Sequence, residues 1–464
     1  MRDRIAAALK ESKADYTELR IEEREASNVV YRGKQLETVD AVIDTGGIVR
    51  CLSRNHGWGI ATFNSLDDLP ARVEQAYQCA SAAQTKEPIE LASVPPREER
   101  IRATLGATDG ATLERDFRGV SLAEKKALAE TYNRIMLSFS DKIVDTTTTY
   151  RDSFTRLFFA SSEGTFIEEE RPVVAIACFA VARDGDNVQS AHKSRANQRG
   201  FEVAQRCEDL ALGAAKMAVD LLSAESVVGG QYPVVINPNL AGVFVHEAFG
   251  HLSESDFVYE NPRAREMMVL GRRFGADILT VFDDGSLPGL RGTHRYDDEG
   301  TPTRHNDLIK NGILVGRLHS RETAAKMGEA VTGNARAINY RHPPIVRMTN
   351  TAIQAGSTPF ERMVGDIKLG IYACDAYGGE TALENFSFSS GYAYMIRDGQ
   401  VAELVKDVIL AGNLFTTLAN IDAIGNDFQW ANTAGGCGKG SQSPLPVGMG
   451  APHVRIQNVV IGGR

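Results

Sequence analysis

The run Val243-Phe-Val-His-Glu-Ala-Phe-Gly-His251 places two histidines and a glutamate inside a largely apolar segment. Ionisable groups in such a segment are costly to bury unless something binds them. A helical histidine-glutamate pair followed by a second histidine is how zinc peptidases hold a metal beside a general base. The sequence therefore makes His246, Glu247 and His251 candidates for a metal-dependent active site.

The spacing of the two histidines is one residue longer than in the usual His-Glu-x-x-His pattern. Each residue of an α-helix turns by about 100°, so side chains five positions apart diverge by about 140°. His246 and His251 could share a metal only if the helix widens into a π-type turn or ends before His251. We expect Gly250 to permit either distortion at little steric cost. The alternative is an ordinary helix with one buried and one exposed histidine.

The residues before the motif predict a strand followed by a helix. Tyr232-Pro-Val-Val-Ile236 is typical of a strand, and Asn237-Pro238 provides a capping side chain and a proline suited to the first helical turn. We therefore expect the motif on a strand-to-helix element.

The composition limits the class of protein. The chain has 464 residues, of which 43% are hydrophobic and 24% charged, as is ordinary for a soluble globular protein with room for two domains. The net charge of -9 argues against a nucleic-acid-binding surface. No apolar run approaches the about 20 residues that span a bilayer, and we expect no membrane segment. Six scattered cysteines predict reduced thiols in the cytoplasm.

The pattern of apolar residues predicts an α+β fold of two domains. The first, over 1–225, is expected to mix helices with antiparallel sheets, with a possible inner boundary near 87–102. The second, over 226–464, is expected to be mostly antiparallel β-structure and to carry the metal-site helix. The expected strands of the first half lie within 16–63, 144–152, 155–161 and 165–183, and its helices lie over 2–12, 67–83, 122–139 and 203–223. In the second half, Asn-Gly and Asp-Gly turns predict hairpins over 308–315 and 394–401, and a helix is expected over 357–365.

A second candidate site segment, Ala434-Gly-Gly-Cys-Gly-Lys-Gly440, lies near the C-terminus. The flanking glycines would let Cys437 approach closely with unusual dihedral angles. Lys439 would help to keep the thiol ionised. Together with the two histidines, Cys437 would form a His-His-Cys zinc site with one position open for water. Taken alone, Cys437 could be a loop thiol without function, and Glu254 or Asp256 could be the third ligand instead.

The motifs of the second half together resemble those of the TldD/PmbA family of metallopeptidases. In the family's order they are His246-Glu-Ala-Phe-Gly-His251 with Glu254 and Asp256, Asp298-Glu-Gly-Thr-Pro-Thr303, and Cys437-Gly-Lys439 with Gln442 and Pro446-Val-Gly448. The first half also resembles the family's N-terminal domain, with weaker signals. In this family the catalytic, TldD-type member carries the histidine motif and its PmbA-like (TldE) companion lacks it. This sequence resembles the TldD type.

The resemblance implies a cytoplasmic zinc peptidase that works as a homodimer or with a PmbA-like (TldE) partner. It also implies a cavity between subunits that admits only unfolded or flexible peptide. It favours His246, His251 and Cys437 as ligands of Zn²⁺. Glu247 would then take a proton from water and deliver it to the leaving amine, and the two acidic residues downstream would orient an imidazole.

Two other functions remain open at this point. A non-catalytic regulatory or scaffold subunit of such a complex is one, although the presence of Glu247 argues against it. A zinc amidase acting on small molecules is the other, since it needs the same ligands. Peptide is expected to bind by strand addition to an exposed sheet edge. The group that stabilises the oxyanion has only candidates by residue type: His294, His305, His319, Arg291 and Arg295.

Overall fold

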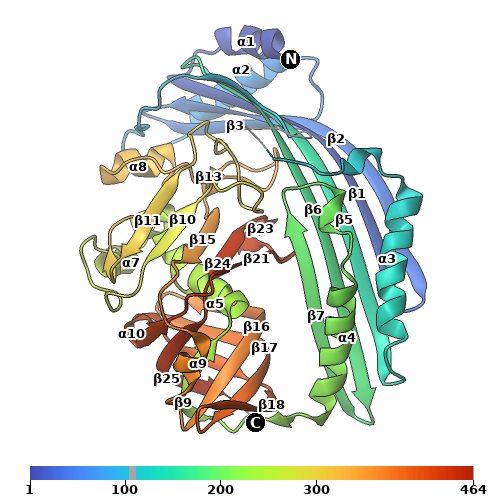
Figure 1. The fold of residues 1–464 in the computed structure, drawn as a ribbon. Helices are drawn as coiled ribbons and strands as arrows, with labels where there is room; N and C mark the ends of the chain where they lie inside the picture. Colours follow the sequence, from blue (N-terminus) through green and yellow to red (C-terminus); the bar gives the residue numbers. More distant parts are fainter. Residues whose placement is uncertain (104–110, 463–464) are drawn as a thin grey trace.

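A long, curved sheet forms the first half of the chain (Figure 1). The computed structural model describes residues 1–103 and 111–462. The strand order is β3-β2-β1-β5-β6-β4, with β7 also paired to β6, and all neighbours are antiparallel except β4 and β6. The strands are β1 (Tyr16–Arg32), β2 (Gln35–Ser53), β3 (Gly57–Phe63), β4 (Glu98–Ile101), β5 (Ile143–Ser161), β6 (Phe166–Asp184) and β7 (Asn187–Asn197).

The break expected between residues 152 and 155 is absent, and β5 is one strand. Ser153 and Phe154 pair with β1 on one side and with β6 on the other. Because both neighbouring ladders continue through these residues, nothing interrupts the strand.

Helices cover this sheet at one end and on one face. The helices α1 (Arg2–Lys10) and α2 (Leu69–Ala82) pack at the end near β3, and α3 (Leu122–Leu137) and α4 (Glu208–Ser223) lie along the outer face (Figure 1). The helix expected from residue 203 begins only at Glu208, because Arg206 has a φ of 55° and interrupts the helical backbone. Among the helices of the described residues, none combines the length and apolar character that crossing a membrane requires.

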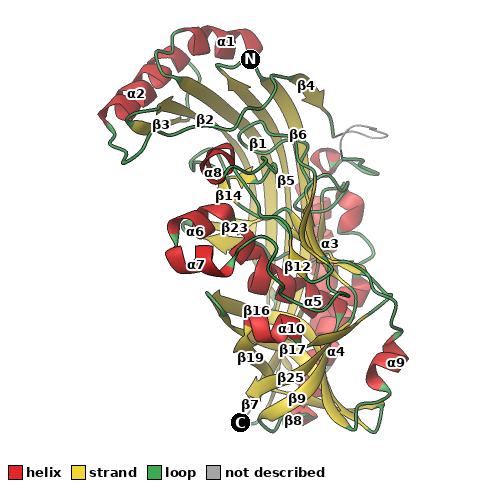
Figure 2. Ribbon diagram, turned by 90° about the vertical axis from the view of Figure 1, so that its left-hand side faces the viewer, coloured by secondary structure: helices red, strands yellow, loops and turns green. Residues whose placement is uncertain are grey.

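The second half contains two larger sheets. One has the order β12-β11-β10-β15-β24-β21, and the other has the order β16-β9-β25-β19-β17-β18-β8, where an additional β16–β17 pairing closes a ring of five strands (Figure 2). The strands are β8 (Glu225–Ser226), β9 (Gly230–Ile236), β10 (Val281–Asp284), β11 (His305–Lys310), β12 (Ile313–Leu314), β13 (Ala335–Arg336), β14 (Ile345–Val346), β15 (Asn350–Ile353), β16 (Leu369–Ala382), β17 (Asn385–Arg397), β18 (Gln400–Lys406), β19 (Ile409–Asn413), β20 (Ile421–Ile424), β21 (Gln429–Ala431), β22 (Cys437–Lys439), β23 (Gln442–Leu445), β24 (Gly448–Ala451) and β25 (Val454–Gly462). The helices are α5 (Pro238–Val245), α6 (Ser255–Glu260), α7 (Pro262–Met267), α8 (Arg321–Met327), α9 (Phe360–Val364) and α10 (Leu414–Ala419).

Both predicted hairpins of the second half are confirmed. Asn311 and Gly312 join β11 to β12 with φ values of 50° and 75°, and Asp398 and Gly399 join β17 to β18 with values of 47° and 77°. Positive φ at both central residues is the requirement of the type I′ turn that these dipeptides favour.

The α+β class with antiparallel sheets is confirmed, and the helix that carries the histidine motif lies in the second half. The two large buried clusters of the first half contain no residue beyond Leu222, and the main cluster of the second half begins at Val227. The boundary between residues 225 and 226 and the inner boundary near 87–102 stay predictions.

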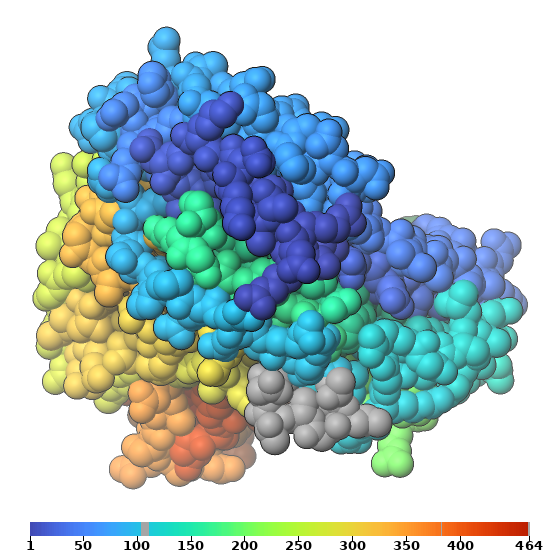
Figure 3. Space-filling view, turned by 90° about the horizontal axis from the view of Figure 1, so that it is seen from above, coloured from blue at the N-terminus to red at the C-terminus, as the bar shows by residue number. Residues whose placement is uncertain are grey.

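Buried ion pairs join the two halves at the loop that follows β10. Asp298 pairs with Arg20 of β1 at 3.2 Å and with Arg171 of β6 at 3.0 Å, and Glu299 pairs with Arg50 of β2 at 3.2 Å. Figure 3, seen from above, shows residues of the first half beside those of the second. Burial alone would raise the pKa of Asp298, but the charges of Arg20 and Arg171 outweigh this effect and lower the pKa to about 2. The motif that begins at Asp298 therefore fastens the second half to the sheet.

We expect Asp298→Asn to lower the free energy of unfolding by about 3 kcal/mol, because breaking a buried ion pair leaves its partners uncompensated. The value lies at the low end of the usual range because Arg20 also pairs with Glu22, and Arg171 with Glu169. Denaturant unfolding at neutral pH measures it. Since the folded state depresses this pKa, the contribution is present above the unfolded value and is lost as the pH falls towards 2.

The matched control is Asp277→Asn, which breaks an exposed ion pair with Arg273. Exposed pairs contribute about 0–1 kcal/mol. Equal, small effects of the two substitutions would contradict a fastening role for Asp298.

Candidate metal centre

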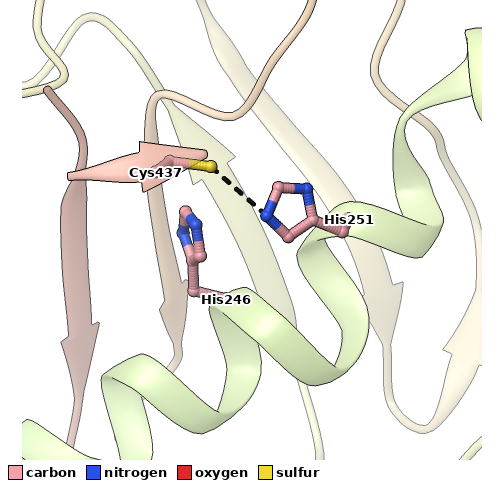
Figure 4. A group of neighbouring side chains, drawn as sticks. All are labelled: His246, His251 and Cys437. Carbon is pink, nitrogen blue, oxygen red and sulfur yellow. Dashed lines mark hydrogen bonds between the residues drawn. The ribbon is translucent and has the colours of Figure 1, made fainter. Parts of the chain in front are cut away.

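The motif adopts a single π-helical turn, η3 (His246–Gly250), between α5 and a short 3₁₀ turn, η4 (His251–Ser253). The N–H of His251 donates to the carbonyl of His246, so the hydrogen bond spans five residues. The two imidazole centroids lie 5.2 Å apart, and both rings project from the same side of the helix (Figure 4). A π-type turn was one of the two solutions stated for this spacing, and its presence here overcomes the divergence that a regular helix would impose.

Gly250 serves this turn through its small volume. Its φ of -54° and ψ of -49° are ordinary helical values, so its backbone dihedral angles alone do not call for glycine. A Cβ atom at this position would lie 2.0 Å from the sulfur of Met348. Glycine therefore lets the helix pack closely against the side chain of Met348.

The helix begins as the sequence predicts. The side chain of Asn237 accepts a hydrogen bond from the Leu240 N–H at 2.9 Å, and Pro238 occupies the first turn. The preceding strand β9 pairs with β16 and β25 in the ring of strands. The helix α5 packs against β16 of the ring and β24 of the other sheet, which fixes the direction in which the histidines point.

The hairpin of β22 and β23 brings Cys437 to the histidines. Its Sγ atom lies 3.3 Å from His251 Nε2, and one ligand atom of each of His246, His251 and Cys437 lies within 4.8 Å of the others. The hairpin is held by Arg347, which is fully buried and donates to the carbonyls of Cys437 at 2.8 Å and Gln442 at 3.2 Å. Arg347 is not among the residues predicted above, although a charge within the run Ile345-Val-Arg-Met348 is a signal.

The donor set fits a metal ion. His246 is 1% exposed, and within the described part of the chain neither of its ring nitrogens has a hydrogen-bond partner. A buried imidazole without partners is costly, and a metal would satisfy one nitrogen. Two imidazoles and one thiolate favour zinc over magnesium or calcium.

The electrostatics of the site favour the thiolate form of the cysteine. Burial raises the pKa of Cys437, but His246 and His251 lower it, to about 5. The thiolate is the form that binds a metal. Lys439, expected to help keep this thiol ionised, pairs through its ammonium with Glu254 at 3.0 Å and Asp256 at 2.7 Å.

Glu254 and Asp256 have different roles. His251 donates from Nδ1 to Glu254 Oε2 at 3.0 Å, which leaves Nε2 directed at the sulfur. Burial raises the pKa of Glu254, but Lys439 and His251 lower it, to about 2, so this carboxylate is ionised. Asp256 accepts from Lys439 and from the Val346 N–H. The geometry thus suits Glu254, and not Asp256, for orienting the imidazole.

We expect Glu254→Gln to weaken zinc binding by about 10–100-fold, because a carboxylate that orients a ligating histidine contributes this much. Competition with a chromophoric chelator measures the affinity. Asp256→Asn is the matched control, since it also loses a charge beside Lys439 but leaves the contact to His251. Equal losses in both variants would assign the effect to Lys439 instead.

Glu247 lines two cavities of about 630 Å³ each. Its Oε2 lies 3.8 Å from His251 Nε2, its side chain is 27% exposed, and no described residue donates a hydrogen bond to it. The sheet-side cavity reaches the face of β5 to β7 and includes His246, Glu247, Cys437, Ser194, Arg291 and Asp152 in its lining. The helix-side cavity includes Glu247, His251, Glu254, Phe257, Glu380 and Lys439. A free carboxylate therefore stands where the two cavities and the ligand cluster meet.

Of the oxyanion candidates, Arg291 lines the sheet-side cavity. The others line neither cavity, and the described contacts engage them elsewhere. His305 contacts Asp284 and Asp307, His319 contacts Thr323 and Glu329, and His294 contacts the Gly292 carbonyl. For Arg295 the contact is made by its backbone, whose N–H donates to Glu169.

Comparison with known proteins matches this chain to one family along most of its length. Residues 17–83 match PmbA/TldA metallopeptidase domain 1, residues 115–222 the central domain, and residues 229–463 the C-terminal domain. A metalloprotease of Synechocystis is 47% identical over 98% of this chain and 96% of its own. A zinc metalloprotease TldD homolog of Saccharolobus solfataricus is 30% identical over 68% of this chain and 70% of its own.

The fold is also that of a solved structure. TldE from Thermococcus kodakarensis superposes with a TM-score of 0.77 over all of both chains, at 18% identity. With three matched domains and relatives similar over nearly the whole length, the chain belongs to the TldD/PmbA family of metallopeptidases.

Proposed function

We propose that this metallopeptidase depends on zinc and hydrolyses unfolded or flexible peptides, with His246, His251 and Cys437 as the zinc ligands and Glu247 as the general base. The observation that carries the proposal is the convergence of the three ligand atoms within 4.8 Å. The free carboxylate beside them, at the wall of both cavities, supports it.

Zinc at this site would act as a Lewis acid that lowers the pKa of a water and polarises the scissile carbonyl. Glu247 accepts the proton of that water and returns it to the leaving amine. Its freedom from hydrogen bonds to other described residues suits both transfers. Glu254 holds the imidazole of His251 in one ring orientation through the Nδ1 hydrogen bond of 3.0 Å.

The cavities suit an extended chain. Each lies within the range of about 300–1,000 Å³ typical of small-ligand pockets, which is too small for a folded domain. The edge strand β7 pairs with β6, and its His192 and Ser194 line the sheet-side cavity. We propose this edge as the place of strand addition. Peptide bound as a helix, or away from β7, would contradict it.

We also propose that the protein works in the cytoplasm as a homodimer or with a PmbA-like (TldE) partner. All six cysteines are free in the structure, as expected of a reducing compartment. The similarity of fold to TldE is compatible with a paired assembly. Light scattering of the purified chain, alone and with such a partner, measures the assembly.

Hydrolysis assays with the zinc-loaded protein test the function. We expect cleavage of an unstructured peptide, no cleavage of a stable folded domain, and loss of activity with a chelator that zinc restores. Cleavage confined to small amides would favour the amidase. Absence of cleavage in the zinc-loaded protein would favour a regulatory subunit.

A further inference from the structure

Arg291 is a buried cation that lacks a counter-ion. Arg291 is only 9% exposed, and its Nη1 donates to the carbonyls of Thr433 at 2.9 Å and Gly435. Its Nε is buried without a hydrogen-bond partner, and no described carboxylate forms an ion pair with it. Burial lowers its pKa to about 10, which leaves it protonated at neutral pH. An uncompensated buried charge is costly unless a ligand of opposite charge joins it.

Arg291 stands close to the proposed reaction centre. It lines the same cavity as His246, Glu247 and Cys437. The Gly435 carbonyl that it binds belongs to the residue two positions before Cys437, and two residues span at most about 7 Å. The guanidinium of Arg291 therefore lies within roughly 10 Å of the Cys437 backbone, which is at most about three residues of an extended peptide at about 3.3 Å per residue.

The charge of the sheet-side cavity agrees with an anionic ligand. Arg24 and Arg151 also line it. Its carboxylates are those of Asp152, which Lys125 neutralises at 2.6 Å, and Glu247. The walls thus carry an excess of positive charge.

The helix-side cavity has the opposite balance. Its lining contains Glu247, Glu254 and Glu380 against the one cation Lys439, which is already paired with Glu254 and Asp256. A peptide that passes Glu247 would therefore find a cationic wall on one side and an anionic wall on the other.

We propose that Arg291 binds a carboxylate of the peptide substrate, on the sheet side of the scissile bond. The Nε–H and Nη2–H edge of a guanidinium donates to the two oxygens of a carboxylate in a bidentate pair. That edge is the one that the contacts to Thr433 and Gly435 leave free. The carboxylate is either the C-terminus of the peptide or an Asp or Glu side chain. This inference rests on the proposed function, and it makes Arg291 a determinant of specificity.

The test separates binding from cleavage. Zinc-loaded Glu247→Gln protein is titrated with fluorescent unstructured peptides that share one sequence and differ only in carboxylates. One peptide has a free C-terminus and no acidic side chain, one has a C-terminal amide, and one has the amide and a single Glu. Anisotropy gives the dissociation constants. The same titrations follow with Arg291→Met and Arg291→Lys added, and with Arg273→Met as a control for an exposed arginine outside both cavities.

With Arg291 present, we expect at least one carboxylate-bearing peptide to bind about 10–100-fold more tightly than the amide, the factor expected of hydrogen bonds between charged groups. Preference for the free C-terminus identifies the terminal carboxylate, and preference for the Glu peptide identifies a side chain. Arg291→Met removes the preference, Arg291→Lys keeps part of it, and Arg273→Met leaves it intact.

Three results would overturn the inference. The first is equal binding of all three peptides when Arg291 is present. The second is an equal loss for all three peptides in Arg291→Met together with lost zinc, which would mean that Arg291 only supports the 433–435 segment. The third concerns Arg291→Met in the enzyme that retains Glu247. A fall in its kcat that is equal for the carboxylate-bearing and the amidated peptides, without a change in KM, is what loss of an oxyanion donor would give. A persistent preference in a protein that cleaves no peptide would instead support the inference and refute the proposed function.

Discussion

Replacing Glu247 by glutamine is expected to lower kcat for peptide hydrolysis by about 10²–10⁴-fold, the usual contribution of a general base. Glutamine keeps the size of the side chain but cannot accept the proton of the attacking water. Because Glu247 lies outside the proposed ligand set, one zinc per chain should remain, and peptide should still bind. Steady-state kinetics with metal analysis on the same sample measure both quantities.

The control for this substitution is Glu260→Gln, an exposed glutamate at the end of α6 that lines neither cavity. It should retain full activity. If Glu247→Gln kept more than about a tenth of the activity with zinc bound, another group would be the base.

Replacing Cys437 by alanine is expected to have the largest effect on metal binding. Loss of a residue that merely supports a ligand costs about 10–100-fold in affinity, so loss of a ligand should cost more than about 100-fold. The purified variant should contain little zinc and show no peptide hydrolysis. Elemental analysis and chelator competition measure the change, and His246→Ala and His251→Ala should behave alike.

Cys207→Ala is the matched control for the loss of a buried thiol. Cys207 lies beside α4 in the first half, and burial raises its pKa to about 11, so it is a neutral thiol away from the site. Its replacement should leave zinc content and activity unchanged. Retention of one zinc per chain in Cys437→Ala would instead make Glu254 or Asp256 the third ligand.

The local part of the site was predictable from the sequence because it depends on spacing. The separation of His246 and His251 excludes a regular helix geometrically, and the turn found at these residues is one of the two solutions stated for it. The hairpins at 311–312 and 398–399 are equally local, since their dipeptides specify the backbone.

The long-range part was less accessible. The approach of Cys437 to the histidines came from the resemblance, because nothing in the chain between His251 and Cys437, which are 186 positions apart, specifies the contact. The ion pairs of Lys439 with Glu254 and Asp256 were not predicted, since a flexible ammonium follows the nearest carboxylates and these are known only once the chain is folded. Arg347 and the special position of Arg291 depend on what surrounds each guanidinium, which composition does not encode.

The ion pairs of Lys439 have a further consequence for the metal-free protein. They tie the β22–β23 strand pair to the segment after His251 at 3.0 Å and 2.7 Å without using any donor atom of the proposed zinc site. Removal of the metal by a chelator should therefore leave the β22–β23 strand pair next to the segment that carries the two histidines. Zinc fingers differ, since they unfold when the ion is removed. Binding of a new ion would then require little ordering of the chain, and the protein would stay folded while the ion is exchanged.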